Sequence, residues 1–94
     1  MRLEVLHVPD CPNLHLLLDR LAAVTPVPVR MRLIESEADA ERFGMTGSPT
    51  LLVDGVDPFG TGDQVSLSCR LYRDASGKSV GVPSVDQLRS VTSG

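Results

Sequence analysis

Residues 3–21 have the sequence LEVLHVPDCPNLHLLLDRL, and this stretch decides the fold. Its first part, residues 3–8, is rich in β-forming side chains and stops at Pro9, so it predicts a strand that is buried on both faces. Leucines then recur at the spacing of an amphipathic helix: Leu14, Leu17, Leu18 and Leu21. The predicted order is therefore a strand, a tight turn that contains Cys11, and a helix.

Two residues of this turn bear on where the helix begins. Asp10 is predicted to be the N-cap, because its short polar side chain can accept a hydrogen bond from the first turn. Pro12 is tolerated in that turn, where a backbone N–H has no partner inside the helix in any case. The helix is expected to end near Val24, before Pro26.

The next segments repeat the strand–helix order. Residues 27–34 alternate apolar and polar side chains, which predicts a second strand. Ser36 and Asp39 have the spacing of a capping box and Gly44 can close a helix, so a short helix is predicted over residues 37–43. A right-handed crossover through the first helix would make the two strands parallel.

A third strand and a hairpin are predicted after this β-α-β-α opening. The apolar residues 50–53 lead into Asp54-Gly55, which is a strong hairpin signal, and Val56 could begin the return strand. Residues 57–64 contain Pro, Gly and Asp, so they are expected to form a mobile loop.

The C-terminal part predicts one more strand and one more helix. Residues 66–72 alternate polar and apolar side chains, as in a strand, and residues 74–78 form a turn. Ser84 and Gln87 then have capping-box spacing at the start of an amphipathic helix.

Composition limits the class of protein. With 94 residues, of which 41% are hydrophobic, the chain is expected to be a single domain over residues 1–94 with a modest aliphatic core. The net charge is −3 and no basic stripe is present, so we expect no nucleic-acid partner. No apolar run is long enough to span a bilayer, and the first residues lack the features of a signal peptide. These observations, together with only two cysteines, predict a cytoplasmic protein without a membrane partner.

The order of these elements resembles the thioredoxin fold, an α/β fold in which a central mixed sheet is flanked by helices. Cys11 lies where the first strand turns into the first helix, as does that family's first active-site cysteine. The sequence Gly47-Ser48-Pro49-Thr50 is similar to the family's proline loop, in which a cis-proline precedes the third strand and faces the reactive thiol. The resemblance covers most of the chain apart from residues 57–64, and it implies the order β-α-β-α-β-β-α.

The chain departs from this family at the redox motif. The family's motif is Cys-x-x-Cys, and here the run is Cys11-Pro12-Asn13-Leu14, so Leu14 cannot act as a resolving thiol. Dithiol chemistry at the usual site is therefore excluded. Residues 68–72 also resemble a feature of short bacterial thioredoxin-like proteins, some of which are labelled as related to organomercurial (alkylmercury) lyase.

Cys11 and Pro49 are the predicted catalytic residues. The N–H groups at a helix start stabilise a thiolate, which could attack a disulfide, be oxidised or bind a soft metal. Because Pro9 and Pro12 flank Cys11, we expect its side chain to lie outside the deep core. The resemblance implies a cis Ser48–Pro49 bond that would direct backbone groups toward an extended partner chain. An inert cysteine on a scaffold without this chemistry is the alternative.

Cys69 is the candidate second thiol. Its strand phase places it on the same face as Leu67 and Leu71, which favours a small buried core side chain. The other interpretation makes it a distant resolving thiol or a second metal ligand for Cys11. A disulfide between them would need Cα atoms within about 7 Å of each other.

Several polar residues are weaker candidates. His15 follows Cys11 by one helical turn and could touch the thiolate, although a solvated helix position is the simpler interpretation. His7 is expected to be a hydrogen-bonded packing residue. Asp10 could act as an acid or base beside the thiol, although capping is the simpler role. One cysteine and one histidine do not make a zinc site, and no cofactor motif is present, so no cofactor is expected.

Three functions follow from these residues. The first is a monothiol redox protein in which Cys11 exchanges with a disulfide protein or with a small thiol such as glutathione. The second is soft-metal or organomercurial handling by Cys11 together with Cys69. The third is a non-catalytic module that binds proteins through the groove of the fold. The first is preferred because it needs only one favourable site.

Overall fold

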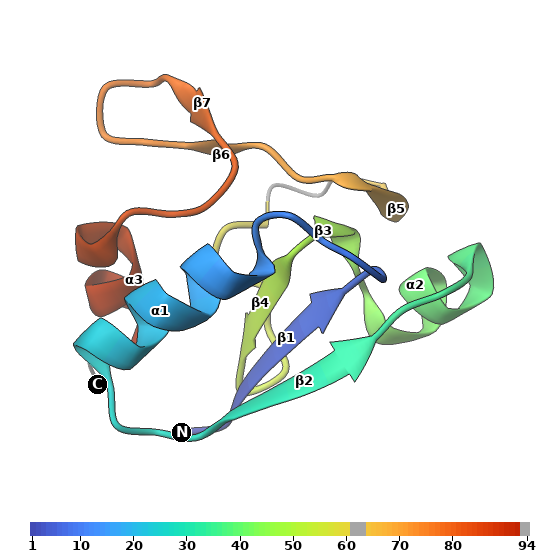
Figure 1. The fold of residues 1–94 in the computed structure, drawn as a ribbon, viewed down its shortest axis with the longest axis horizontal. Coiled ribbons are helices and arrows are strands. Elements are labelled where there is room, and N and C mark those ends of the chain that lie inside the picture. The colour runs from blue at the N-terminus through green and yellow to red at the C-terminus, as the bar shows by residue number, and fades with distance from the viewer. Residues whose placement is uncertain (61–63, 93–94) are drawn as a thin grey trace.

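The β-forming residues Leu3–His7 make β1, which is the central strand of a mixed three-stranded sheet. The computed structural model describes residues 1–60 and 64–92. On one side β1 pairs in parallel with β2 (Val29–Leu33), and on the other it pairs antiparallel with β4 (Thr50–Val53). The predicted parallel pairing of the first two strands is therefore confirmed (Figure 1).

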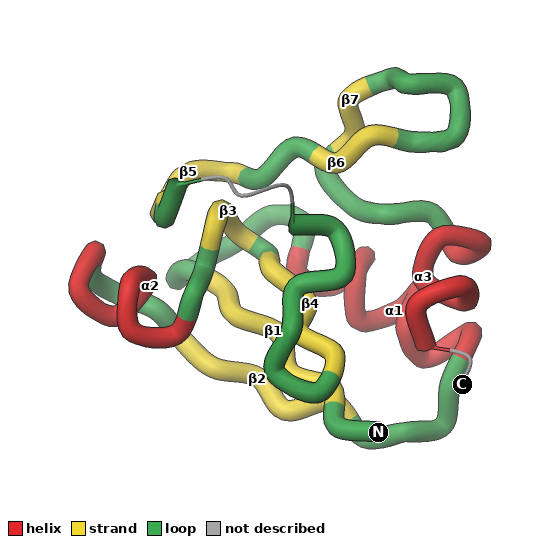
Figure 2. Tube along the Cα trace, turned by 180° about the vertical axis from the view of Figure 1, so that it is seen from behind, coloured by secondary structure: helices red, strands yellow, loops and turns green. Residues whose placement is uncertain are grey.

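Helices cover both faces of this sheet. α1 (Leu14–Val24) and α3 (Val85–Thr92) contact each other and lie side by side over one face (Figures 1 and 2). The shorter α2 (Glu37–Phe43) packs against the other face near the ends of β1 and β2. The radius of gyration is 12.2 Å, and a compact domain of this length is expected to have about 12 Å.

The two faces have separate hydrophobic clusters because successive strand residues point to opposite sides. Val5 and Leu51 pack against α1 and α3, whereas Leu6 and Leu52 pack on the side of α2. The aliphatic core expected from the composition is thus divided by the sheet. Among the described residues, no helix has the length and apolar character needed to cross a membrane.

Local capping signals set the bounds of two helices as predicted. The hydroxyl of Ser36 accepts a hydrogen bond from the Asp39 N–H at 3.1 Å, and Gly44 ends α2 with a φ of 80° that glycine adopts without steric cost. At α3, the Gln87 N–H donates to the Ser84 hydroxyl and the Ser84 N–H donates to the Gln87 side chain, which completes the capping box.

The region after β4 differs from the prediction. Val56 forms only an isolated bridge with Val53, so the turn at residues 54–55 is not followed by a paired return strand. The predicted strand at residues 66–72 is divided into β5 (Ser66–Cys69) and β6 (Tyr72–Arg73).

Neither piece of the divided strand joins the three-stranded sheet in the part of the chain that the structure describes. β5 instead pairs in parallel with β3 (Thr46–Ser48), and β6 forms a hairpin with β7 (Ser79–Val80). In the loop predicted at 57–64, residues 57–60 form a turn, and residues 61–63 lie outside the described part.

We expect Ser84→Ala to lower the free energy of unfolding by about 1 kcal/mol, because the first turn of α3 loses its side-chain acceptor. Urea unfolding followed by circular dichroism measures this change. Ser79→Ala is the matched control, since the exposed Ser79 side chain has no hydrogen bond among the described residues. An equal loss in both variants would contradict the capping role.

Candidate functional site

The candidate site lies where β1 ends and β4 begins. The antiparallel register pairs Leu6 with Thr50, so the residues just before Thr50 lie beside the segment that leads from β1 to Cys11. The Val8 N–H donates to the Ser48 hydroxyl at 3.1 Å, which fastens the two segments together. The peptide bond between Ser48 and Pro49 is cis, as predicted.

Cys11 is more buried than expected and lies outside the helix. Its side chain is only 8% exposed, although two prolines flank it. The helix starts at Leu14, whose N–H donates to the Cys11 carbonyl at 3.3 Å, so Cys11 occupies a turn that precedes α1. The helix therefore begins three residues after Cys11, later than predicted.

The predicted cap at Asp10 is also wrong. Asn13 holds the N-cap position of α1, and its side chain makes no capping hydrogen bond. Asp10 is exposed and has a φ of 56°, a left-handed conformation that aspartate tolerates better than most residues. It turns the chain between β1 and Cys11. Pro12 is exposed and belongs to the same turn rather than to the first helical turn.

Tyr72 connects the thiol with the proline loop. Its hydroxyl donates to the Pro49 carbonyl at 2.5 Å. Burial raises the pKa of Tyr72 to about 12; Arg70 opposes this increase, whereas the negative charges of Asp57 and of the Cys11 thiolate add to it. The Cys11 thiol therefore lies close enough to Tyr72 for their charges to interact.

A buried ion pair supports this arrangement. Arg70 is 6% exposed and donates to both carboxylate oxygens of Asp57, at 2.5 and 3.2 Å. The same guanidinium donates to the hydroxyls of Thr46, at 3.2 Å, and Thr50, at 3.4 Å. A charge so far from solvent is stable only when paired and hydrogen bonded, and these partners supply that need.

Aromatic rings and a glycine fit closely around Arg70. Its guanidinium lies 4.5 Å from the centre of the Tyr72 ring, and the edge of the Phe59 ring meets Tyr72 with their centres 5.6 Å apart. A Cβ added at Gly47 would lie 2.9 Å from the Arg70 Cα, and Gly47 has a φ of 125°. Both the space and the backbone conformation therefore require glycine there.

The chain's own β5 occupies the backbone edge of the proline loop. The Arg70 N–H donates to the Ser48 carbonyl at 3.0 Å, and the Ser66 N–H donates to the Met45 carbonyl at 3.1 Å. This is the edge at which an extended partner chain was expected. The backbone acceptor at Ser48 is thus already used by an internal strand.

The predicted burial of Cys69 is wrong. Cys69 is exposed, Leu71 is 70% exposed, and the buried side chains near them are those of Arg70 and Tyr72. The segment alternates as predicted but with the opposite phase, because the ion pair of Arg70 with Asp57 and the bond from Tyr72 to the proline loop face inward. Cys69 lines a hollow of about 530 Å³ beside Phe59.

The two cysteines are both free thiols, and their surroundings differ. Cys11 is buried near Tyr72, whereas Cys69 lies opposite Ser48 in the pairing of β3 with β5. Ser48 thus borders both the Cys69 strand and the segment leading to Cys11. Within residues 1–60 and 64–92, no three His, Cys, Asp or Glu side chains form a group that could hold a metal ion.

The remaining candidates lie apart from the thiol chemistry. His15 is exposed on α1, which agrees with a solvated position. A ring nitrogen of His7 lies 3.1 Å from the Val8 carbonyl, as expected of a hydrogen-bonded packing residue. Asp54 accepts a hydrogen bond from the Arg2 N–H and so fastens the N-terminus.

Sequence reasoning missed Arg70, Asp57 and Tyr72. Asp57 lies in the loop predicted at residues 57–64, and Arg70 occupies a predicted strand position between two apolar residues. One signal was available: Phe59 and Tyr72 are two of the three aromatic residues in the chain, and each lies within two residues of a member of the ion pair. Comparison of the chain with protein-family models, curated proteins and solved structures gave no match.

We expect Arg70→Met to lower the free energy of unfolding by about 3 kcal/mol, because it leaves the Asp57 carboxylate without its buried partner. Arg32→Met is the matched control, since the pair of Arg32 with Glu4 is more exposed and should contribute at most about 1 kcal/mol. Urea unfolding of the three proteins measures both effects. Similar losses in both variants would show that the Arg70 pair is not special.

The single tyrosine can be titrated by its own absorbance. We expect a midpoint near 12 in the folded protein and near 10 in concentrated urea. Because the unfolded chain releases this proton first, the contribution of Tyr72 to stability should be constant below pH 10 and be lost between about pH 10 and 12. Cys11→Ser should lower the folded midpoint by removing the thiolate charge, and an unchanged midpoint would argue that the two side chains are not close.

Proposed function

We propose that this chain is a monothiol protein of thioredoxin-like architecture in which Cys11 carries out thiol–disulfide exchange. The observation that carries the proposal is the meeting of three segments at one point. Cys11 lies in the turn after β1, Pro49 in the proline loop and Tyr72 in β6. The Tyr72 hydroxyl donates to the Pro49 carbonyl, and the charge of the Cys11 thiolate contributes to the raised pKa of Tyr72. The other thiol of the chain, Cys69, is exposed.

The proposed reaction uses one thiol of the chain. The Cys11 thiolate attacks one sulfur of a disulfide, a new S–S bond forms, and the other sulfur leaves as a thiolate that takes up a proton. No net oxidation occurs, because one disulfide replaces another. Since Leu14 cannot resolve this intermediate, a second thiol from solution must release the product.

The burial of Cys11 favours a small substrate. At 8% exposure little of Cys11 is open to solvent, so a small disulfide such as oxidised glutathione is favoured over a bulky one. A protein substrate that paired with the proline loop would first have to displace the bond from the Arg70 N–H to the Ser48 carbonyl. We therefore propose a small thiol as the main partner, in a reducing compartment such as the cytoplasm.

Soft-metal or organomercurial handling by Cys11 and Cys69 is a second candidate. It is favoured by one observation: Ser48 is paired with Cys69 on one side and bonded to the segment before Cys11 on the other. This function needs both thiols, whereas exchange needs only Cys11. A non-catalytic binding module would need neither.

The deciding experiment is performed on Cys69→Ser, so that Cys11 is the only thiol. Oxidised glutathione should form a mixed disulfide at Cys11 in the native protein, detected by intact mass and reversed by added thiol. Cys11→Ser is the matched control, and its exposed Cys69 reports how fast an unassisted thiol reacts. If Cys11 reacts no faster than Cys69 does in that control, exchange at Cys11 is not the function.

A second measurement separates the metal candidate. Mercuric ion should bind the wild-type chain much more tightly than either single-cysteine variant if both thiols are ligands. Equal binding by the wild type and Cys69→Ser would remove this candidate.

A further inference from the structure

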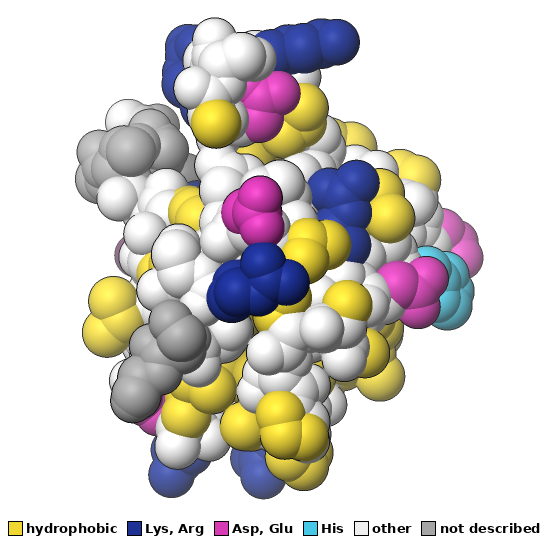
Figure 3. Space-filling view, turned by 90° about the vertical axis from the view of Figure 1, so that its left-hand side faces the viewer, with side chains coloured by type: hydrophobic (Ala, Val, Ile, Leu, Met, Phe, Trp, Pro, Cys, Tyr) yellow, Lys and Arg dark blue, Asp and Glu magenta, His cyan; other side chains and the backbone are white. Residues whose placement is uncertain are grey.

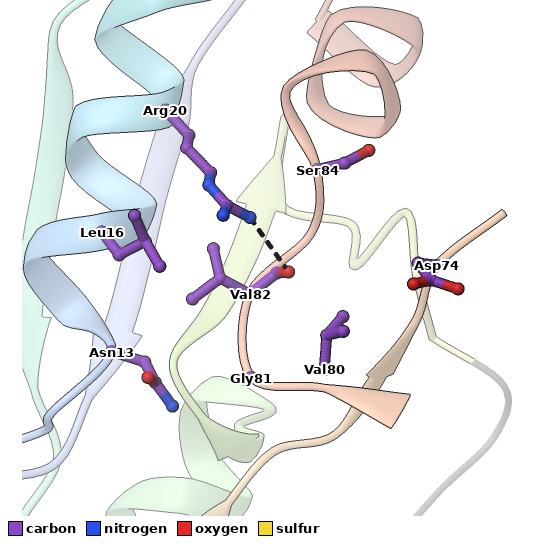
Figure 4. A pocket seen from close by; sticks show the side chains of 8 residues that line it. All are labelled: Asn13, Leu16, Arg20, Asp74, Val80, Gly81, Val82 and Ser84. Carbon is purple, nitrogen blue, oxygen red and sulfur yellow. Dashed lines mark hydrogen bonds between the residues drawn. The ribbon is translucent and has the colours of Figure 1, made fainter. Parts of the chain in front are cut away.

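A groove runs between α1 and the segment that leads into α3 (Figure 4). Its volume is about 320 Å³, at the lower end of the range for small-molecule sites. Leu16, Val80 and Val82 give it an apolar floor, and its polar lining residues include Asn13, Arg20 and Asp74. Neither cysteine lines it. We name it the α1 groove.

Arg20 supplies a fixed positive charge to the α1 groove. One nitrogen of its guanidinium donates to the Pro83 carbonyl at 2.8 Å and to the Val82 carbonyl at 3.4 Å. These bonds hold the side chain across the wall, as Figure 4 shows for Val82. The other N–H groups donate to no other described residue, so they can bind a carboxylate without rearrangement.

Asp74 supplies a negative charge on the other side. One carboxylate oxygen accepts from the Ser76 hydroxyl at 2.6 Å and from the N–H groups of Ser76 and Lys78, both at 2.9 Å. These bonds lower the pKa of Asp74, so it is ionised at neutral pH. The second oxygen accepts no hydrogen bond from the described residues and can receive an ammonium group.

Asn13 adds an amide between these charges and the turn of Cys11. Its side chain makes no capping hydrogen bond although it holds the N-cap position. A Cβ added at Gly81 would lie 2.6 Å from the Asn13 side-chain nitrogen, so the Asn13 amide packs directly over the backbone of Gly81. Its amide therefore lines this end of the groove, where it can contact a peptide group.

The spacing along α1 sets the length of one wall of the groove. Asn13 and Arg20 are seven positions apart, which corresponds to about 10 Å of helix. Three extended residues span about the same length. The apolar floor can hold an aliphatic side chain, and both signs of charge are interspersed over this side of the molecule (Figure 3).

We propose that the α1 groove binds short zwitterionic peptides, with the C-terminal carboxylate on Arg20 and the N-terminal ammonium on Asp74. The apolar floor contacts the central side chain, and the Asn13 amide contacts the peptide backbone. A phosphate or nucleotide fits less well, because Asp74 would repel it. This binding does not require Cys11 to react, so it stands apart from thiol exchange.

The probe is the sulfur-free tripeptide Ala-Leu-Ala, titrated into the full chain and followed by amide chemical shifts. We expect shifts at residues 13–20 and 80–84. Arg20→Gln should weaken binding at least about tenfold, as should amidation of the peptide C-terminus, because each removes one charge-assisted contact. In Arg20→Gln, the amidated and free peptides should bind equally.

Two variants guard against a merely structural effect. Arg20→Lys keeps the cation and should retain a preference for the free C-terminus, whereas Arg89→Gln removes an exposed arginine of α3 and should bind as the wild type does. Acetylation of the peptide N-terminus should weaken binding to the wild type but not to Asp74→Asn. Absence of shifts at these residues would overturn the proposal, as would equal weakening of the free and amidated peptides by Arg20→Gln.

Discussion

The guanidinium of Arg70 carries a full charge into a position where only 6% of the side chain meets solvent. Burial of such a charge is tolerated only when most of its donors are matched, and Asp57 with two threonine hydroxyls provides the match. These acceptors come from β3, from β4 and from the loop after β4. The Arg70 side chain therefore holds β3, β4 and the loop after β4 in fixed relative positions, although β3 and β4 belong to different sheets.

The orientations of Tyr72 and Cys69 follow from this ion pair. Once Arg70 faces inward, its neighbour Tyr72 also faces inward, and the Tyr72 hydroxyl reaches the Pro49 carbonyl. The backbone of Arg70 meanwhile bonds to Ser48. The same orientation turns Cys69 outward, so one thiol is enclosed and the other is exposed. The outward position of Cys69 is thus a consequence of the inward position of Arg70.

Local signals in the sequence predicted local structure well. The helix ends marked by Ser36 and Ser84 were correct because each depends on partners within three residues. The phase of β5 and β6 was not predictable in this way, because it depends on the bond from Arg70 to Asp57, a residue in a separate loop. The start of α1 was misplaced for a different reason: Asp10 adopts a left-handed turn instead of serving as a cap.

The pairing of β5 with β3 places an internal strand at the edge where an external strand would have to bind. An intramolecular strand behaves as a ligand at an effective concentration of about millimolar or more. An external strand of equal intrinsic affinity would have to be present above that concentration to displace β5 from the Ser48 carbonyl. A strand of lower affinity would need a proportionally higher concentration. An extended molecule that binds weakly would therefore not displace β5, whereas a molecule too small to use this edge would meet no such competition. Selection by size can thus arise from chain connectivity alone.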